Sequence, residues 1–312
     1  MKLVAVVGST ATGKSALGLH LAEAFGGEII SADSTAVYRR IDIGTDKVPI
    51  GERRGIPHHL IDIVEPTETY SAARFAADAA TAARAIVARG RVPILVGGTG
   101  FYVRALVRGM FPGPARDDET RARLNAVAEK KGVEYLHRWL ARVDPASGVR
   151  IQPRDQKRLV RALEVRLLTG RSLTDHFENT VSPIPEFAVL TLGVSLPRDV
   201  LRPRVARRVD AQFARGVVAE VQTLIAGGVP ATAHAFSGLV YRQVIEMLRG
   251  VRGDAETRAL IVQENMRYAR RQAIWFRKEA GIHWLDGAGE TPATQAQADS
   301  IVDTFLKTSS GD

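Results

Sequence analysis

The stretch L-V-A-V-V-G-S-T-A-T-G-K-S, residues 3 to 15, decides the fold of this chain. Its apolar first part predicts a buried strand, and its last eight residues match the spacing G-x-x-x-x-G-K-[ST] at the start of a helix. In such a loop, backbone N–H groups turn inward around phosphate oxygens, and the helix adds the positive end of its dipole. We therefore predict a phosphate site made of Gly8, Ser9, Thr10, Ala11, Thr12, Gly13, Lys14 and Ser15.

Two side chains of this loop have distinct expected tasks. Lys14 supplies a mobile positive charge to a terminal phosphate, and the Ser15 hydroxyl is placed to bind a Mg²⁺ that bridges the same phosphates. The loop alone does not identify the ligand that carries these phosphates. Its phosphates could belong to ATP, to a nucleotide that is being phosphorylated, or to a diphosphate that leaves during the reaction.

The first third of the chain has the pattern of a parallel α/β sheet. Short, continuous apolar runs are typical of strands that are covered on both faces. They occur at residues 3–7, 28–30, 60–64 and 92–96. Between the last two runs, an alanine-rich stretch from Ser71 to Arg89 predicts a crossover helix that ends at Gly90.

The rest of the chain divides at proline-rich borders near residues 112 and 185. We predict a catalytic core made of residues 1–112 and 186–312, with residues 113–185 inserted as a helical unit. The second part of the core is expected to return to the sheet with a strand at 187–194 and to continue with helices around 200–226 and 256–279. The last twenty or so residues are polar, and we expect them to fray.

The amino-acid composition restricts the classes of function that are possible. The chain has 312 residues, with 43 Lys and Arg against 34 Asp and Glu, a formal net charge of +9. Thirteen Lys and Arg against five Asp and Glu lie within residues 121–171, a strongly basic part of the insert that favours a polyanionic partner. Cysteine is absent, which excludes disulfides and thiolate chemistry. No apolar stretch approaches the roughly 18 residues of a membrane helix, and we expect a cytoplasmic protein.

Three function classes compete at this stage. A nucleotide hydrolase is disfavoured because the strand at residues 92–96 runs into G-G-T-G at 97–100 and not into a metal-binding Asp. A small-molecule or nucleoside kinase would share the sheet, the loop and the magnesium. A non-catalytic RNA-binding protein would use the basic surface without any chemistry.

An ordered series of motifs resembles the tRNA dimethylallyltransferases, also called tRNA isopentenyltransferases. The series spans about residues 3 to 286 and is far more specific than the phosphate loop alone. Besides that loop, it comprises I-S-A-D-S at 30–34, D-I-G-T at 42–45, P-H-H-L-I-D-I at 57–63, Y-S-A-A-R-F at 70–75, G-G-T-G-F-Y at 97–102, R-L-V-R-A-L-E-V at 158–165, Y-R-Q at 241–243 and A-R-R-Q-A-I-W-F-R at 269–277.

The resemblance implies a specific reaction. The family transfers a dimethylallyl group from dimethylallyl diphosphate to N6 of adenosine 37, beside the tRNA anticodon. The loop would hold the departing diphosphate, and Lys14, Mg²⁺ on Ser15 and backbone N–H groups would stabilise its growing charge. By the same resemblance, Asp33 is the general base that accepts the N6 proton, Thr99 lies near both substrates, and Arg208 faces the diphosphate.

The resemblance also implies a tRNA surface. Because the target base must leave its stack, the expected partner is the anticodon stem-loop of tRNA. We expect the enzyme to be a monomer. The matching tRNA-contact positions are Asp33, Ser34, Thr35, Ala36, Thr99, Arg121, Lys157, Arg158, Leu159, Val160, Arg161, Tyr241, Arg242 and Gln243. The chain departs from the family before Tyr241, where Leu239 and Val240 stand in place of a small residue that is commonly Gly.

Overall fold

The computed structural model describes residues 1–111, 113–178 and 180–308, and divides the chain into two compact units. The first unit, which we call the core unit, contains Met1–Val107 and the chain from Pro183 onward. The second unit, which we call the helical unit, spans Arg108–Ser182. We predicted an insert at residues 113–185, and its role in tRNA binding stays a prediction.

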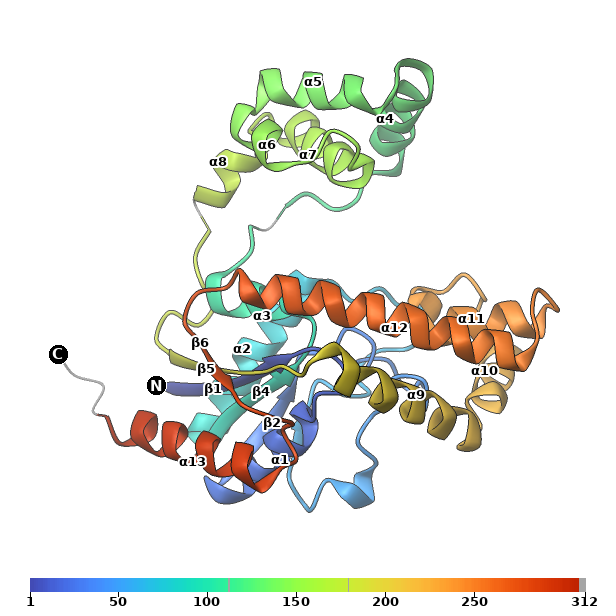
Figure 1. Cartoon of the computed structure of the whole chain (residues 1–312). Helices are drawn as coiled ribbons and strands as arrows, with labels where there is room; N and C mark the ends of the chain where they lie inside the picture. Colours follow the sequence, from blue (N-terminus) through green and yellow to red (C-terminus); the bar gives the residue numbers. More distant parts are fainter. Residues whose placement is uncertain (112, 179, 309–312) are drawn as a thin grey trace. The chain divides into compact units, whose positions relative to one another are not determined.

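A six-stranded parallel sheet forms the centre of the core unit (Figure 1), which confirms the predicted fold class. Its strands, in spatial order, are β3 (His58–His59), β2 (Gly27–Ser31), β4 (Val92–Gly97), β1 (Lys2–Gly8), β5 (Ala188–Val194) and β6 (Ile282–Leu285). The order jumps from β4 back to β1 and on to β5, so β1 has parallel partners on both sides. Loops that follow such central strands meet at one edge of the sheet, where open α/β folds bind their ligands.

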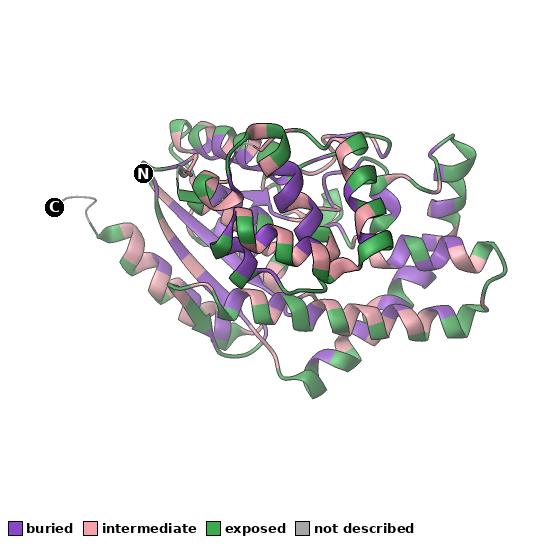
Figure 2. Ribbon diagram, turned by 90° about the horizontal axis from the view of Figure 1, so that it is seen from above, coloured by how far each residue is buried: buried purple, intermediate pink, exposed green. Residues whose placement is uncertain are grey.

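Helices cover both faces of this sheet. On one face, Val4 and Val6 of β1 pack in a core that includes Leu17 of α1 (Lys14–Ala24) and Val302 of α13 (Pro292–Lys307). On the other face lie α2 (Ala72–Ala88) and α3 (Gly100–Arg108) (Figure 1). Most strand residues are fully buried (Figure 2), which explains why the apolar runs are continuous and do not alternate.

The strand predicted at residues 60–64 is wrong in position. The strand at this edge of the sheet is the two-residue β3, at His58–His59, and residue 64 makes an isolated bridge to Tyr38. Leu60 and Asp62 have φ angles of 61° and 58°. This left-handed conformation is incompatible with an extended strand, so the apolar residues at 60–64 line a tight turn instead.

The expectation that the C-terminal residues fray is also wrong for the part of the chain that the structure describes. Residues 292–307 form α13, which begins at the N-cap Thr291 and buries Ala298 and Val302 against α1 and the sheet. The polar residues of this segment lie on the opposite side of an amphipathic helix.

Four further helices complete the core unit beside the sheet. They are α9 (Arg198–Ala214), α10 (Val217–Ala226), α11 (Leu239–Leu248) and α12 (Asp254–Arg277). The helix predicted around residues 200–226 is thus two helices, because Gly216 adopts a φ of 93° between them. The long α12 packs against both α9 and α11 (Figure 1).

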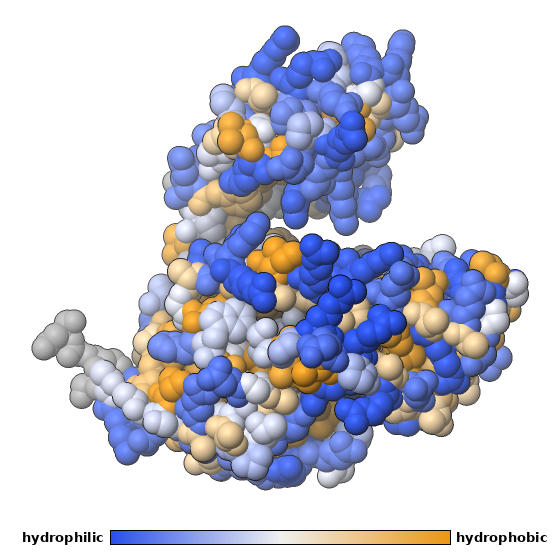
Figure 3. All heavy atoms as spheres, in the orientation of Figure 1, coloured by the Kyte–Doolittle hydropathy of each residue, from blue (hydrophilic) through white to orange (hydrophobic). Residues whose placement is uncertain are grey.

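The helical unit has a core of its own. Its elements are α4 (Asp118–Lys131), α5 (Val133–Val143), α6 (Pro145–Arg150), α7 (Gln156–Thr169) and α8 (Leu173–Glu178). Leu124, Leu136 and Leu163 are buried together between α4, α5 and α7. Hydrophilic residues cover most of the face that Figure 3 shows, in keeping with the basic composition of this segment. Over the residues described in both units, none of the helices is long and apolar enough to span a bilayer.

Candidate functional site

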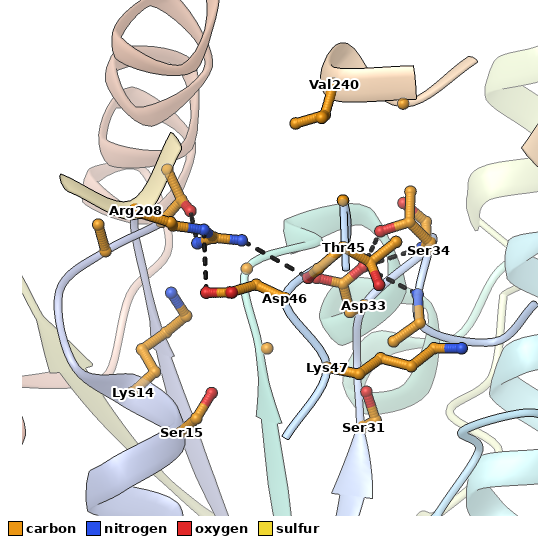
Figure 4. A pocket seen from close by; sticks show the side chains of 18 of the residues that line it. Lys14, Ser15, Ser31, Asp33, Ser34, Thr45, Asp46, Lys47, Arg208 and Val240 are labelled. Atoms are coloured by element: carbon orange, nitrogen blue, oxygen red, sulfur yellow. Dashed lines mark hydrogen bonds and ion pairs between the residues drawn. The ribbon is translucent and has the colours of Figure 1, made fainter. Parts of the chain in front are cut away.

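A cleft of about 940 Å³ opens at the carboxyl edge of the sheet in the core unit. The loops that follow β1, β2 and β4 contribute Lys14, Asp33 and Gly98 to its lining. Arg208 of α9 and Val240 of α11 also line it (Figure 4). The fold thus brings together three of the four predicted catalytic residues, Lys14, Asp33 and Arg208, from segments that are far apart in sequence.

The glycine-rich loop at residues 8–15 requires both of its glycines. Gly8 has a φ of 147°, and a Cβ on it would lie 2.1 Å from the Val194 carbonyl oxygen. Gly13 has a φ of 91°, and a Cβ there would lie 2.0 Å from the Glu290 carboxylate. Because any larger residue would collide in these positions, the two glycines allow the loop to pass close to β5 and to the segment before α13. The predicted strand, loop and helix are confirmed.

Lys14 lies at the first turn of α1 and points along the loop, where its Nζ donates to the Ser9 carbonyl oxygen. Burial lowers the pKa of Lys14 to about 7, with a further contribution from the nearby Arg208 guanidinium, while Asp33 acts in the opposite direction. A bound phosphate would reverse this shift, because an anion favours the protonated amine. Lys14 is therefore a half-buried amine at the cleft, whose positive charge is stabilised when an anion arrives.

Arg208 connects α9 to the glycine-rich loop. One nitrogen donates to Thr10 Oγ1 at 2.7 Å, and Nε lies 3.0 Å from the Asp46 carboxylate. Figure 4 shows this guanidinium above Lys14, with the Asp46 carboxylate directly beneath it. The predicted diphosphate-facing arginine is thus oriented toward the loop by a second residue, Asp46, which the sequence reasoning did not include.

Asp33 follows β2 and is held by a local turn. Its Oδ1 accepts from the backbone N–H of Thr35 at 2.8 Å, from the Thr35 hydroxyl at 2.7 Å and from the N–H of Ala36 at 3.3 Å. Its Oδ2 has no hydrogen-bond partner among the described residues. The carboxylate is therefore fixed by one oxygen, and the other remains available to accept a proton.

Thr99 lies between the β4 loop and this turn. Its Oγ1 accepts from the Ser34 N–H at 3.2 Å and lies 3.5 Å from the Ser34 hydroxyl. The side chains of Thr99 and Ser34 thus connect the ends of β4 and β2 beside the cleft. Thr35 is half-buried and Ala36 is buried, so these two predicted tRNA contacts serve mainly to build the turn around Asp33.

Sequence reasoning missed the residues that hold the glycine-rich loop from behind. Gln272 of α12 accepts from the Thr10 N–H at 2.9 Å and donates to the Gly98 carbonyl at 2.9 Å, so it joins the loops after β1 and β4. Arg204 of α9 donates to the Ala11 carbonyl at 2.8 Å. Gln272 belongs to the quoted motif at 269–277, but no spacing rule reveals that it contacts residues 262 and 174 positions earlier.

The predicted contact segment on α11 is largely buried in the core unit. The Tyr241 ring is 1% exposed, and its hydroxyl donates to Glu220 at 2.6 Å. Gln243 is 3% exposed and donates to Glu264, which also pairs with Arg242. Val240 is buried as well, and both Val240 and Tyr241 line the cleft. The structure therefore gives Tyr241 and Gln243 internal hydrogen-bond partners.

In the helical unit, the predicted tRNA contacts separate into two sets. Leu159 and Val160 are buried in its core, and Arg121 and Arg161 pair with the fully buried Glu164. These two guanidiniums and the Asp117 N–H lower the pKa of Glu164 to about 2, against the opposing effect of burial. Lys157 and Arg158 are exposed on the first turn of α7. Of the α7 set, these two are the exposed cations, and Arg158 also pairs with Asp155 at 3.2 Å.

The fold and the cleft define a class: an α/β protein whose cleft brings together a carboxylate, a lysine and an arginine beside a glycine-rich loop. Comparisons with known proteins narrow this class. The family model described as "IPP transferase" matches residues 36–279. A tRNA dimethylallyltransferase of Thermomicrobium roseum is 47% identical over 285 residues, which cover 91% of this chain and 86% of that protein.

Comparison with solved structures leads to the same family. The full-length tRNA isopentenylpyrophosphate transferase of Bacillus halodurans aligns with a TM-score of 0.73 and 35% identity, over 98% of this chain and 97% of that one. A eukaryotic dimethylallyltransferase described as acting on tRNA aligns with a TM-score of 0.80 and 26% identity, over 98% of this chain and 79% of that one. This chain belongs to the tRNA dimethylallyltransferase family, as its motifs predicted, and is a transferase.

Proposed function

We propose that this chain transfers the dimethylallyl group of dimethylallyl diphosphate to N6 of adenosine 37 in tRNA, with release of diphosphate. The observation that carries the proposal is the shared cleft, which is lined both by the glycine-rich loop with Lys14 and by the Asp33 carboxylate. A leaving-group site and a proton acceptor at one cavity are what alkyl transfer to a weakly basic amine requires. Family membership supports the same reaction.

On the leaving-group side, the chain offers positive groups and N–H donors to the diphosphate. Lys14 and Arg208 both lie at the glycine-rich loop, and the first turn of α1 adds its N-terminal N–H groups. As the allylic C–O bond breaks, negative charge grows on the diphosphate, and these groups stabilise that charge more strongly than the charge of the ground state.

On the nucleophile side, Asp33 is the group that can accept the N6 proton. Its Oδ1 is held by the turn at residues 33–36, so its Oδ2 can approach the amine without a change in the turn. Proton transfer to a fixed carboxylate makes N6 a better nucleophile as the new C–N bond forms. Thr99, which bonds to the same turn, keeps the ends of β2 and β4 in register beside the reacting atoms.

The residues also fit Mg²⁺. Ser15 is exposed to the cleft, and its hydroxyl has no hydrogen-bond partner among the residues described. Within the same described residues there is no group of three His, Cys, Asp or Glu side chains that could hold a metal by itself. Magnesium commonly takes few protein ligands and completes its shell with phosphate oxygens and water. Ser15 would supply the protein ligand, and the bound ion would neutralise charge on the diphosphate.

The partner surface and cellular setting complete the proposal. The exposed Lys157 and Arg158 of the basic helical unit fit the phosphates of an anticodon stem-loop, because such contacts give affinity and register without reading sequence. We propose a monomeric enzyme that acts in the cytoplasm, where its tRNA substrate is found.

The proposal is tested by incubating the protein with radiolabelled dimethylallyl diphosphate and an unmodified tRNA that has adenosines at positions 36 and 37. Labelled tRNA should form with Mg²⁺ and without ATP, and chelation of the metal should reduce the rate strongly. Absence of transfer, combined with ATP consumption in the presence of a nucleoside, would replace the proposal with the kinase alternative, which the comparisons do not favour.

A further inference from the structure

A second hydrogen-bond cluster lies behind the anion site, on the far side of Arg208. It is centred on Glu220 of α10, a residue that none of the motifs includes. Glu220 Oε2 accepts from the N–H groups of Asp42 and Ile43 at 2.9 and 2.8 Å. Its Oε1 accepts from the Tyr241 hydroxyl at 2.6 Å and from the Gly44 N–H at 3.4 Å. One carboxylate thus fixes three consecutive N–H groups.

The loop that Glu220 holds, residues 42–47, is also fixed at its carbonyl groups. Gln212 donates to the Gly44 carbonyl at 3.3 Å, and Arg215 donates to the Ile43 carbonyl at 3.4 Å. Gly44 itself is packed so closely that a Cβ would lie 2.6 Å from Tyr241 Cζ. The 42–47 loop is therefore clamped between α9, α10 and α11 along its backbone.

This clamped loop contains the residue that orients Arg208. Asp46 lies 2.6 Å from the Arg215 guanidinium and 3.0 Å from Arg208 Nε, and Arg208 in turn donates to Thr10 of the glycine-rich loop. The interactions form one continuous series from Glu220 through the loop and Asp46 to Arg208. The side chains of Glu220 and Tyr241 make no hydrogen bond to the glycine-rich loop among the residues described.

We propose that Glu220 is a positioning residue for diphosphate binding, which acts by fixing the 42–47 loop so that Asp46 orients Arg208 toward the anion site. The proposal rests on the function proposed above, and it assigns Tyr241 to this cluster, where its hydroxyl braces the Glu220 carboxylate. A carboxylate is required, because it accepts from every N–H group that faces it, whereas an amide would present two donors to them.

The test measures inorganic pyrophosphate binding by titration calorimetry in the presence of Mg²⁺, alongside steady-state kinetics for each substrate. In Glu220→Gln we expect pyrophosphate affinity to fall about tenfold and the KM for dimethylallyl diphosphate to rise by a similar factor, because the charge-assisted hydrogen bonds to the loop are removed. The tRNA KM should stay within about twofold of the unchanged protein. A general loss of structure would change both substrate constants together.

Three further variants keep the test independent of folding. Asp46→Asn leaves the Glu220 cluster intact and weakens the pairing with Arg208, so it should reproduce the pyrophosphate defect of Glu220→Gln. The double variant should be little worse than either single one, because both changes interrupt the same series of interactions. Glu186→Gln, which alters an ion pair with Arg84 elsewhere in the core unit, is the matched control and should bind pyrophosphate normally.

The outcomes separate this inference from the proposed function. If Lys14→Ala binds pyrophosphate as tightly as the unchanged protein, the anion site itself is misassigned and the proposed function fails. If Lys14→Ala abolishes binding but Asp46→Asn and Glu220→Gln retain it, the function stands and the positioning role is overturned. Additive losses in the double variant would also overturn it, since the two residues would then act separately.

Discussion

At the scale of single residues, the site depends on how each ionisable group is held. Asp33 uses one carboxylate oxygen for a tight turn and leaves the other open to the cleft. Lys14 is half-buried, and desolvation together with the nearby Arg208 lowers its pKa to about 7. A transfer reaction of this kind needs both groups. The fixed carboxylate can accept a proton, and the amine gains positive charge when an anion binds beside it.

Replacement of Asp33 by Asn tests the proton-accepting role with little disturbance of the turn, because the amide oxygen can still accept from Thr35. We expect the single-turnover rate to fall by about 10²- to 10⁴-fold, the usual contribution of a general base. The Kd for tRNA, measured by filter binding, should change less than about twofold. Parallel losses in rate and affinity would assign Asp33 to RNA positioning.

The lowered pKa of Lys14 predicts a pH dependence of diphosphate binding. Binding of the anion raises this pKa, so the complex takes up a proton above pH 7, and affinity should fall as the pH rises from about 7 toward the unperturbed range of lysine. Below pH 7, the amine is already protonated and its contribution should be constant. Pyrophosphate affinity measured from about pH 6 to 10 checks this dependence.

Lys14→Arg provides the control for that titration, because a guanidinium stays charged throughout the range. Its pyrophosphate affinity should depend less on pH above 7 than that of the unchanged protein. The difference between the two curves removes the titration of pyrophosphate itself. Identical slopes would show that Lys14 is charged in the free protein at all of these pH values.

At the scale of elements, the local hydrophobic pattern correctly predicted the strands whose burial it reflects. The continuous apolar runs at β1, β4 and β5 were identifiable because these strands are buried on both faces. The run at residues 60–64 was misassigned because the backbone conformations of Leu60 and Asp62 are not encoded in apolarity. β6 and α13 were missed because a four-residue strand and a helix with a narrow apolar face give weak signals.

In the candidate site, too, some residues could be predicted from local sequence and others could not. Lys14, Asp33 and Thr99 follow strand ends, so a parallel sheet brings them to one edge, and sequence could predict their proximity. Gln272, Asp46 and Glu220 act through interactions with distant segments, which no local spacing contains. Arg208 was placed by family resemblance, and its route to Thr10 depends on the packing of α9.

The packing of α13 predicts a measurable contribution to stability. Val302 is 1% exposed, and Val302→Ala removes two buried methyl groups from the core that α13 shares with α1. We expect the free energy of unfolding to fall by about 1–2 kcal/mol in urea titrations. Val251→Ala, at a residue 62% exposed, should have almost no effect. Equal stability of both variants would mean that α13 does not pack in solution.

At the scale of the whole molecule, the cleft and a strongly basic helical segment lie in different units. The cleft belongs to the core unit, whereas thirteen of the 43 Lys and Arg lie within residues 121–171 of the helical unit. Polyanion affinity from the exposed cations of the helical unit and catalysis from the cations of the cleft can therefore be altered separately. Such a division suits an enzyme that must hold a large RNA while it modifies one base.

Lys157→Ala tests this division, because the side chain is exposed at the start of α7. We expect weaker tRNA binding and a smaller slope of log K against log salt, by about 0.7–0.9 for each phosphate that the variant no longer neutralises. The rate at saturating tRNA should be unchanged. Lys307→Ala, at an exposed residue of α13 in the core unit, is the control. An unchanged slope in Lys157→Ala would remove this residue from the tRNA surface.

The central claim, that one cleft holds the diphosphate at the glycine-rich loop and the target adenine at Asp33, is tested most directly by a crystal structure of the ternary complex. The measurement uses an unreactive thiolo analogue of dimethylallyl diphosphate and an anticodon stem-loop with adenosine 37. We predict diphosphate oxygens on the N–H groups of residues 8–15 and adenine N6 about 3 Å from Asp33 Oδ2. An adenine bound outside the cleft, or a diphosphate away from Lys14, would contradict the account.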